Sequence, residues 1–310
     1  MRLSFIKCHG SGNDFPLIDA RGLALSDAEW SAAARALADR AGPVGGDGLL
    51  ALLTPAPGTL QMRMWNPDGS EAETCLNGLR CVARAGFEAL GLHEAPVRLK
   101  ASHAEVALDP PLGDGVVTVR ETVGPADLHA RWVAGAERIV ETPIATLASA
   151  RAFTAVAMPN PHLITFVERI DEAELVALGT ICEAAPAWLP GRANVSFVEQ
   201  RGGDLFVRTF ERGVGLTNSC GSAMAAASFA ACLTGRLPYR VPLKVFNAGG
   251  LVRAVVGDDA MVTLSGNATY EWAGSVEVDF ATGRAGELVV ERHYGDEIAA
   301  WSALVDALGR

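Results

Sequence analysis

The chain has 310 residues, and its 36 Asp and Glu residues outnumber its 26 Lys and Arg residues to give a formal net charge of −10. This acidic balance argues against a surface that binds nucleic acid or an anionic membrane. The length allows two domains of about 150 residues, each with its own core. We therefore expect a two-domain protein whose partner is a small polar molecule.

The first 14 residues lack the basic lead and apolar run of a secretory signal, and no stretch approaches the ~18 apolar residues that span a bilayer. We expect a cytoplasmic chain whose six cysteines are free thiols. No cysteine pair has the spacing of a zinc site, and the histidines are scattered, so we infer no metal. The glycine pairs at 10–12 and 213–215 lack the third glycine of a dinucleotide motif, so we expect no nucleotide cofactor.

In the first half of the chain, short strands alternate with turns. Strands are predicted over residues 3–7 and 16–19, on either side of a turn at 9–13. A helix follows over 26–38, where Ser26 and Glu29 form a capping box. Strands over 49–53 and 60–65 then lead through a tight turn at 66–69 to a central helix over 77–90, which Gly91 ends.

The second half repeats this order at an offset near 145 residues, which indicates a duplication. Strands are predicted over 153–158, 163–167, 194–199 and 205–210, and helices over 171–178 and 222–233. The last helix is apolar nearly all round, so it must be enclosed by other elements. The expected fold class is therefore α+β, with two pseudo-symmetric β-barrel-like units that each wrap around a central helix.

Two cysteines, Cys75 and Cys220, lie 145 residues apart in segments that echo each other. Each follows a polar residue, Asn66 or Glu211, by nine positions, and each begins a predicted helix. Unpaired N–H groups and the helix dipole favour an anion at such a place. Two equivalent thiols, one in each half, predict a pair that face each other across a cleft and share one reaction, as in a racemase.

Four separated motifs, at residues 5–15, 66–75, 160–162 and 211–222, resemble diaminopimelate epimerases, and the similarity runs in order to about residue 272. The resemblance implies two units with the active site in the cleft between them. It also implies a crossover near Asn267, so that residues 1–125 and 268–310 form the N-terminal unit and 126–267 the C-terminal unit. The implied activity interconverts LL- and meso-diaminopimelate for lysine and peptidoglycan precursors, without pyridoxal phosphate or a metal.

Inversion at Cα needs a base and an acid on opposite sides of a nearly planar carbanion. Two thiols suit this task because their pKa, about 8.5 when free, is lowered at a helix N-terminus. Cys75 would act as thiolate and Cys220 as thiol in one direction, and they would exchange roles in the other. The backbone N–H groups at the two helix starts are placed to stabilise charge on the substrate carboxylate. They belong to Leu76, Asn77, Gly221 and Ser222.

The resemblance implies further roles at matching positions. His162 and Glu211 would assist the thiols and hold their protonation states. Arg212 would grip the distal carboxylate, which a guanidinium matches bidentately. The asparagines that would bind the distal amino-acid head are Asn13, Asn66, Asn160 and Asn194. Asn13, Asn66 and Asn194 could equally be turn or cap residues.

Three features depart from the family pattern. Leu76 stands where a glycine usually follows the first cysteine, and Gly48 stands where many members carry a glutamine. The tail over 275–310 extends past the usual end. It carries apolar residues at helical spacing, which would pack on the first unit or on a partner subunit in a homodimer. These residues are Ile298, Trp301, Val305 and Leu308.

Three alternatives remain open from the sequence. The first is a racemase of another amino acid, such as histidine, with relaxed recognition of the distal group. The second is a cysteine hydrolase in which Cys220 and His162 form a nucleophile and base pair. The third is a non-catalytic binding protein of the same fold.

Overall fold

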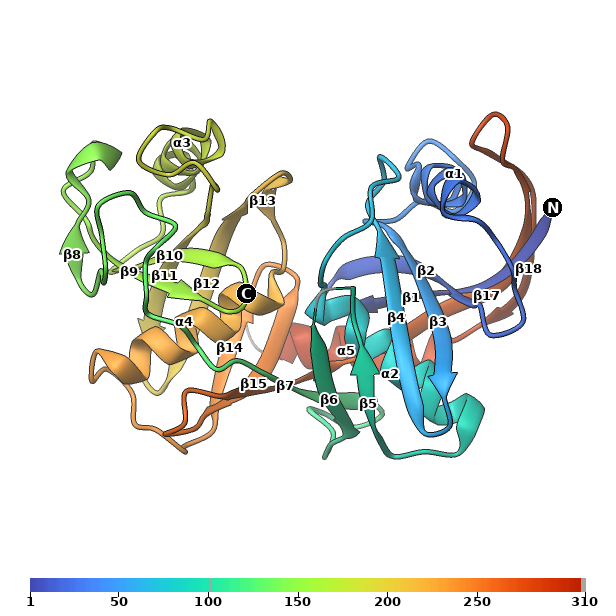
Figure 1. Ribbon diagram of the computed structural model, residues 1–310. Coiled ribbons are helices and arrows are strands. Elements are labelled where there is room, and N and C mark those ends of the chain that lie inside the picture. Colours follow the sequence, from blue (N-terminus) through green and yellow to red (C-terminus); the bar gives the residue numbers. More distant parts are fainter. Residues whose placement is uncertain (101, 308–310) are drawn as a thin grey trace. The chain divides into compact units, whose positions relative to one another are not determined.

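The protein is described here by a computed structural model that covers residues 1–100 and 102–307 (Figure 1). The chain divides into two compact units. The first comprises Met1–Glu121 and Ser265–Arg310, and the second comprises Thr122–Leu264. Each unit builds its own hydrophobic core.

The first unit wraps six strands around one helix. Successive strands pair in alternating sense: β1 with β2 antiparallel, β2 with β3 parallel, β3 with β4 antiparallel, β4 with β5 parallel, and β5 with β6 antiparallel. The enclosed helix is α2 (Leu76–Leu90), which packs against each of these strands. The strands are β1 (Arg2–Gly10), β2 (Asn13–Asp19), β3 (Leu49–Ala56), β4 (Thr59–Trp65), β5 (Glu94–Arg98) and β6 (His103–Leu108).

The second unit repeats this pattern with different residues. Its six main strands pair in the same alternating sense, in chain order. They surround α4 (Gly221–Leu233), whose residues are buried nearly all round, as the apolar sequence predicted (Figure 1). The strands are β9 (Ala152–Ala157), β10 (Pro161–Val167), β11 (Asn194–Arg201), β12 (Asp204–Glu211), β14 (Leu243–Asn247) and β15 (Gly250–Val256). The predicted fold class is confirmed.

Each unit has an equivalent helix, between its second and third main strands, outside the strands. In α1 (Asp27–Ala38), the predicted capping box between Ser26 and Glu29 is present. Trp30 of this helix stacks on Trp65 of β4 with ring centroids 5.1 Å apart. The equivalent helix of the second unit is α3 (Glu172–Glu183), which continues five residues beyond the predicted end at 178. It does so because Gly179 and Cys182 extend its buried face.

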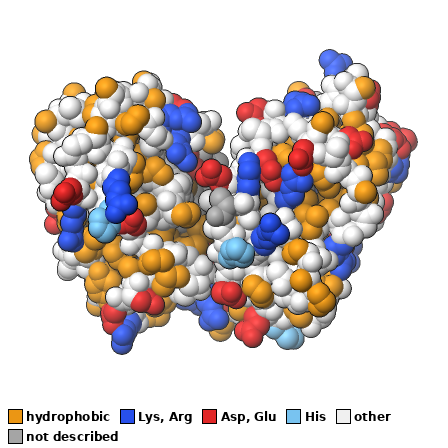
Figure 2. Space-filling model, viewed as in Figure 1, with side chains coloured by type: hydrophobic (Ala, Val, Ile, Leu, Met, Phe, Trp, Pro, Cys, Tyr) orange, Lys and Arg blue, Asp and Glu red, His pale blue; other side chains and the backbone are white. Residues whose placement is uncertain are grey.

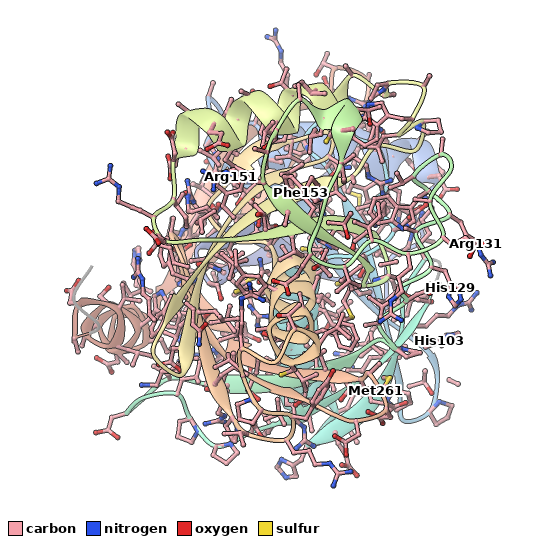
Figure 3. The ribbon with its side chains drawn as sticks, turned by 90° about the vertical axis from the view of Figure 1, so that its left-hand side faces the viewer. His103, His129, Arg131, Arg151, Phe153 and Met261 are labelled. Atoms are coloured by element: carbon pink, nitrogen blue, oxygen red, sulfur yellow. The ribbon has the colours of Figure 1, made fainter. Side chains whose placement is uncertain are left out.

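In the second unit, the start of β9 lies beneath α3, as the side view in Figure 3 shows for Arg151 and Phe153. Phe153 is fully buried in the core under this helix. Arg151 pairs with Glu174 of α3 at 2.5 Å and lies over the ring of Phe197. The outer helix is thus held to the strands by an apolar contact and an ion pair.

The tail adds two strands and a helix to the first unit. β17 (Thr269–Asp279) pairs antiparallel with β1 and with β18 (Arg284–His293). The sequence patterns predicted neither β17 nor β18. The predicted helix is present as α5 (Gly295–Ala307). Its Trp301 is buried against His9, with ring centroids 5.7 Å apart, whereas Ile298 is exposed. Leu308 lies outside the described residues.

Several short elements complete the chain. They are β7 (Thr118–Val123), β8 (Thr142–Pro143), a 3₁₀ helix (Ala145–Leu147), β13 (Gly215–Thr217) and β16 (Val262–Asn267).

None of the helices in residues 1–100 and 102–307 is long and apolar enough to cross a membrane. On the face shown in Figure 2, acidic and basic side chains are interspersed.

Candidate active site

The two predicted thiols occupy the same position relative to their helices. Cys75 is the N-cap of α2 and Cys220 is the N-cap of α4, and both have extended backbone conformations. The N–H of Gly78 donates to the sulfur of Cys75 at 3.4 Å. An N-cap sulfur is close to the unpaired N–H groups of the first helical turn. Each unit therefore presents one thiol at the positive end of its central helix.

In the first unit, one side-chain amide contacts the Cys75 thiol and a second amide bonds to the first. The thiol donates to Oδ1 of Asn13 at 3.7 Å, and Nδ2 of Asn77 donates to the same oxygen at 3.3 Å. Nδ2 of Asn13 donates to the carboxylate of Asp47 at 2.5 Å. Asp47 thus settles which end of the Asn13 amide faces the thiol, because a carboxylate accepts only from the amide nitrogen.

Cys220 is more deeply buried from solvent than the sequence suggested. Its side chain is buried, and burial raises the pKa of the Cys220 thiol well above its usual value. The Glu211 carboxylate raises this pKa further, while the Ser222 hydroxyl and the Ala223 N–H lower it by smaller amounts. The net shift at Cys220 is therefore opposite to the lowered pKa that the sequence predicted, because desolvation of a thiolate outweighs the N–H groups of the helix start.

His162 reaches Cys220 through a hydroxyl group. Its Nε2 lies 3.1 Å from Oγ of Ser222 and 3.2 Å from Oδ1 of Asn160, and Ser222 Oγ lies 3.5 Å from the sulfur of Cys220. The ring is fully buried, and burial together with Arg212 lowers the pKa of His162 to about 3. The imidazole is therefore neutral. Within the described part of the chain, its Nδ1 has no hydrogen-bond partner.

Two more predicted residues, Arg212 and Asn194, bond to each other just beyond the end of β12. Arg212 donates its backbone N–H to Oδ1 of Asn194 at 2.9 Å and its Nη1 to the carbonyl of Gly191 at 3.1 Å. Asn194 sits on β11, directly opposite His162 of β10. Its Nδ2 is buried and has no partner among the residues described. Two buried polar atoms of neighbouring strands are thus left for a ligand to satisfy.

The chain resembles known proteins along most of its length. The family model described as diaminopimelate epimerase matches residues 5–126 and 154–271. The diaminopimelate epimerase of Clostridium acetobutylicum is 36% identical over 289 residues, which cover 90% of this chain and 87% of that protein. The one from Listeria monocytogenes EGD-e is 38% identical over 298 residues, covering 90% of each chain. The chain belongs to the diaminopimelate epimerase family.

Solved structures share the fold of this family member at lower identity. A hydroxyproline epimerase from Agrobacterium vitis superimposes with a TM-score of 0.65 at 14% identity, covering 98% of this chain and 97% of that one. A phenazine biosynthesis protein of Bacillus anthracis has the same TM-score and identity, with 90% and 100% coverage. At this identity the likeness concerns the fold alone.

Asn66 matches a family motif, whereas Leu76 and Gly48 depart from the family pattern, and the structure gives the surroundings of all three. Asn66 closes the turn before α2, since its N–H and Nδ2 donate to the carbonyl and hydroxyl of Ser70 at 2.8 and 3.0 Å. Leu76, the first residue of α2, is buried. A Cβ atom at Gly48 would lie 2.5 Å from the carbonyl oxygen of Trp65. The glutamine common in the family would therefore require the backbone to move here.

Several residues at these sites carry no sequence motif that we recognised. Asp47 orients Asn13, and Thr217 donates its hydroxyl to Glu211 at 2.6 Å. Arg80 donates to Oδ1 of Asn77 at 2.7 Å from one turn along α2. The three-residue spacing of Asn77 and Arg80 was the available signal, because such pairs share a helix face.

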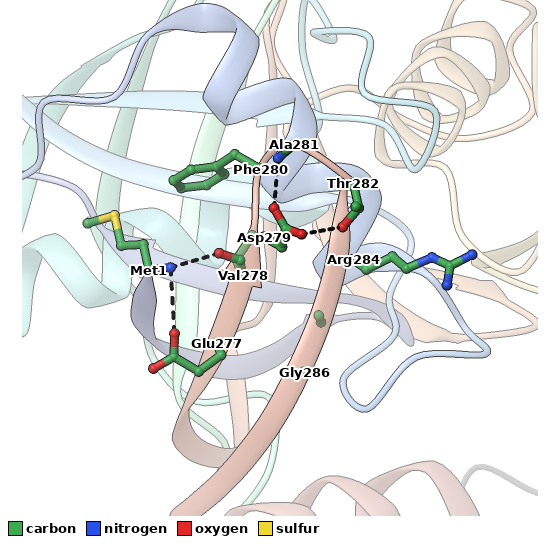
Figure 4. Close-up of a pocket in the computed structure, with 10 residues that line it drawn as sticks. Met1, Glu277, Val278, Asp279, Phe280, Ala281, Thr282, Arg284 and Gly286 are labelled. Atoms are coloured by element: carbon green, nitrogen blue, oxygen red, sulfur yellow. Dashed lines mark hydrogen bonds and ion pairs between the residues drawn. The ribbon is translucent and has the colours of Figure 1, made fainter.

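A depression of about 570 Å³ lies elsewhere, at the turn between β17 and β18 (Figure 4). The polar groups at its edge bond to one another. The Met1 amine bonds to the carbonyl of Val278 at 2.8 Å and lies 3.5 Å from Glu277, and Asp279 accepts from the Thr282 hydroxyl at 2.8 Å. The depression contains none of the predicted site residues, so we assign it no part in the active site.

Proposed function

We propose that this family member interconverts LL- and meso-diaminopimelate by two-base proton transfer at Cα. The observation that carries the proposal is the equivalent placement of Cys75 and Cys220 at the N-caps of the two central helices. A duplicated fold with one thiol in each half supplies one proton carrier for each face of the substrate carbon. A single nucleophile would have no use for the second thiol.

In one direction, the Cys75 thiolate takes the proton from Cα, and the electron pair of that C–H bond moves into the substrate carboxylate. Cys220 then donates its proton to the opposite face, which leaves a thiol at 75 and a thiolate at 220. The raised pKa of Cys220 suits it to hold the proton at the start of this direction. The reverse reaction exchanges the roles, and the thiols carry both transfers without pyridoxal phosphate or a metal.

The N–H groups at the two helix starts would stabilise the charge that develops on the carboxylate. Each such donor contributes about 2.7–4 kcal/mol in enzymes where it has been removed. Those donors are Leu76, Asn77, Gly221 and Ser222. His162, which is neutral, would hold the protonation state of Cys220 together with Glu211. Arg212 would bind the distal carboxylate. The proposed ligands of the distal amino-acid head are Asn13, Asn66, Asn160 and Asn194.

We further propose that the reaction supplies lysine and peptidoglycan precursors in the cytoplasm, that a homodimer is the assembled form, and that nucleic acid is not a partner. The net charge of −10 supports the last point.

One observation favours a second candidate, a racemase of a different amino acid. Leu76 is larger than the usual glycine, and Gly48 has no room for the usual glutamine, so the pocket can differ in shape.

Deuterium incorporation separates these proposals. LL-diaminopimelate, meso-diaminopimelate and single amino acids such as histidine are incubated with the protein in heavy water. We expect deuterium to enter Cα of diaminopimelate as the isomers interconvert. Exchange with another amino acid alone would establish the second candidate. Release of a cleaved product without exchange would point to a cysteine hydrolase, and no reaction at all to a binding protein.

A further inference from the structure

The first turns of α2 cover a buried ion pair that the proposed reaction does not use directly. Arg80 and Glu121 are both fully buried, and Nη1 of Arg80 donates to Oε1 of Glu121 at 2.8 Å. Burial raises the pKa of Glu121 to about 7, against the opposing effect of Arg80. Such a pair is weak evidence for stability, since apolar residues of similar volume often serve as well. Its geometry is more informative.

The guanidinium group of Arg80 lies in a space shaped for it. Its Nη2 donates to Asn77 at 2.7 Å and to Ser11 at 3.3 Å, and its Nε donates to the carbonyl of Asn267 at 3.1 Å. A Cβ atom at Gly10 would lie 2.9 Å from Nη2, and one at Gly266 would lie 2.6 Å from Nε. Any other residue at these positions would collide with the guanidinium.

A chain of hydrogen bonds leads from this group to the thiol. Because Arg80 donates to Oδ1 of Asn77, the Nδ2 of that amide must point the other way. There it donates to Oδ1 of Asn13 at 3.3 Å, the oxygen that also accepts from the Cys75 thiol at 3.7 Å. We propose that Arg80 is a positioning residue that fixes the Asn77 amide and thereby tunes the acceptor beside Cys75.

This arrangement has a definite electrostatic consequence for Cys75. The Asn77 N–H draws charge from the Asn13 oxygen and competes with the thiol for it. If the Asn77 amide turned, that oxygen would accept from the thiol alone. A hydrogen bond to the neutral form of an acid raises its pKa. Loss of the Arg80 contact should therefore make Cys75 harder to deprotonate. The inference rests on the proposed role of Cys75 as a proton carrier.

The test measures the ionisation of Cys75 without relying on turnover. In a Cys220→Ala background, iodoacetamide modification of Cys75 is followed by mass spectrometry as a function of pH. The test variant is Arg80→Met with Glu121→Gln, which removes both charges together. We expect the pH midpoint of alkylation to rise by about one unit. An unchanged midpoint would overturn the proposal.

Two further variants separate orientation from other effects. Arg80→Lys keeps the positive charge but loses the planar fork that reaches Asn77 and Glu121 together. We expect its midpoint to rise as well, and a midpoint equal to that of the background would show that charge alone matters. Arg84→Met is the matched control, because Arg84 lies one turn further along α2, is itself buried, and pairs with the half-buried Glu297 at 2.5 Å.

Arg84→Met should leave the alkylation midpoint unchanged, and an equal rise there would reduce the effect to general loosening of α2. These readouts remain valid if the protein fails to invert diaminopimelate. In that case the shift would still establish Arg80 as a positioning residue, while the proposed function would fall. If the wild-type protein inverts diaminopimelate but the Arg80 variants show no shift in the alkylation midpoint, the proposed function would stand and the role of Arg80 as a positioning residue would fall.

Discussion

Cys75 and Cys220 share a place on their helices but differ in surroundings. The side-chain amide of Asn13 and the backbone N–H of Gly78 contact Cys75, whereas Cys220 is buried beside Glu211 and Ser222, with His162 beyond Ser222. The helix N-terminus alone predicted easy ionisation for both. For Cys220 the loss of water reverses that expectation, because the charged form is penalised by burial.

Removal of either thiol should prevent inversion while the fold remains. We expect Cys75→Ala and Cys220→Ala each to lower kcat for inversion by about 10²–10⁴-fold, the usual contribution of a general acid or base. Circular dichroism spectra should match those of the wild-type protein. Cys232→Ala, which removes a buried thiol outside the proposed site, is the control. Full activity of the Cys75 or Cys220 variant would remove that residue from the mechanism.

His162 should make the protein sensitive to mild acid. Its folded-state pKa, about 3, is below the ordinary value of 6.5, so the unfolded chain binds more protons between these two pH values. Stability should therefore fall as the pH drops from 6.5 to 3, by on the order of 4 kcal/mol from this residue. Urea unfolding of His162→Gln should show a smaller acid loss than the wild-type protein. The exposed His129→Gln should show the wild-type loss.

At the scale of elements, the ends of the helices follow local signals. The Ser26 capping box begins α1, and Gly91 ends α2 in the left-handed conformation with φ of 66°. The start of α3 is equally local, since Asp171 accepts from two N–H groups of its first turn. Its end is not local, because burial of Cys182 under other elements prolongs the helix beyond residue 178.

Gly91 offers a direct test of this local control. A Cβ atom there would meet nothing within 4 Å, so replacement by alanine changes only the backbone preference. We expect Gly91→Ala to lower the free energy of unfolding by about 1 kcal/mol, because alanine resists positive φ. Gly22→Ala is the matched control, since a Cβ atom at Gly22 also has open space. Equal stability of the two variants would argue against the left-handed cap.

At the scale of the whole molecule, each unit arranges its strands in the same order of pairings around its own central helix. The first unit also receives the end of the chain, which adds β17, β18 and α5. Arg84 of α2 anchors α5, since its Nη2 donates to Glu297 at 2.8 Å and its guanidinium stacks over Tyr270. The tail is therefore part of the core of this unit.

Truncation of a tail side chain should consequently destabilise the first unit. Trp301 is 7% exposed, so Trp301→Ala should lower the free energy of unfolding by about 3–5 kcal/mol. Ile298, on the same helix, is 39% exposed, and Ile298→Ala should cost less than about 1 kcal/mol. Urea denaturation measures both. A large loss from Ile298→Ala would instead reveal a partner that covers the outer face of α5.

The sequence by itself determined the features that depend on neighbours along the chain. The capping box at Ser26, the end of α2 at Gly91, the duplication and the order of the four motifs all follow from short-range patterns. The family, which the comparisons confirm, was recognisable from those motifs. The placement of Cys75 and Cys220 at helix N-caps was also visible, because helix starts are encoded locally.

Only the tertiary structure decided what lies around those residues. Arg80 meets a carboxylate 41 positions away and a carbonyl 187 positions away, and no local pattern brings these groups together. The strands β17 and β18 form because β1 offers an edge to β17. The raised pKa of Cys220 and the lowered pKa of His162 arise from burial. Burial is a property of packing between distant segments, so a linear sequence pattern carries no measure of it.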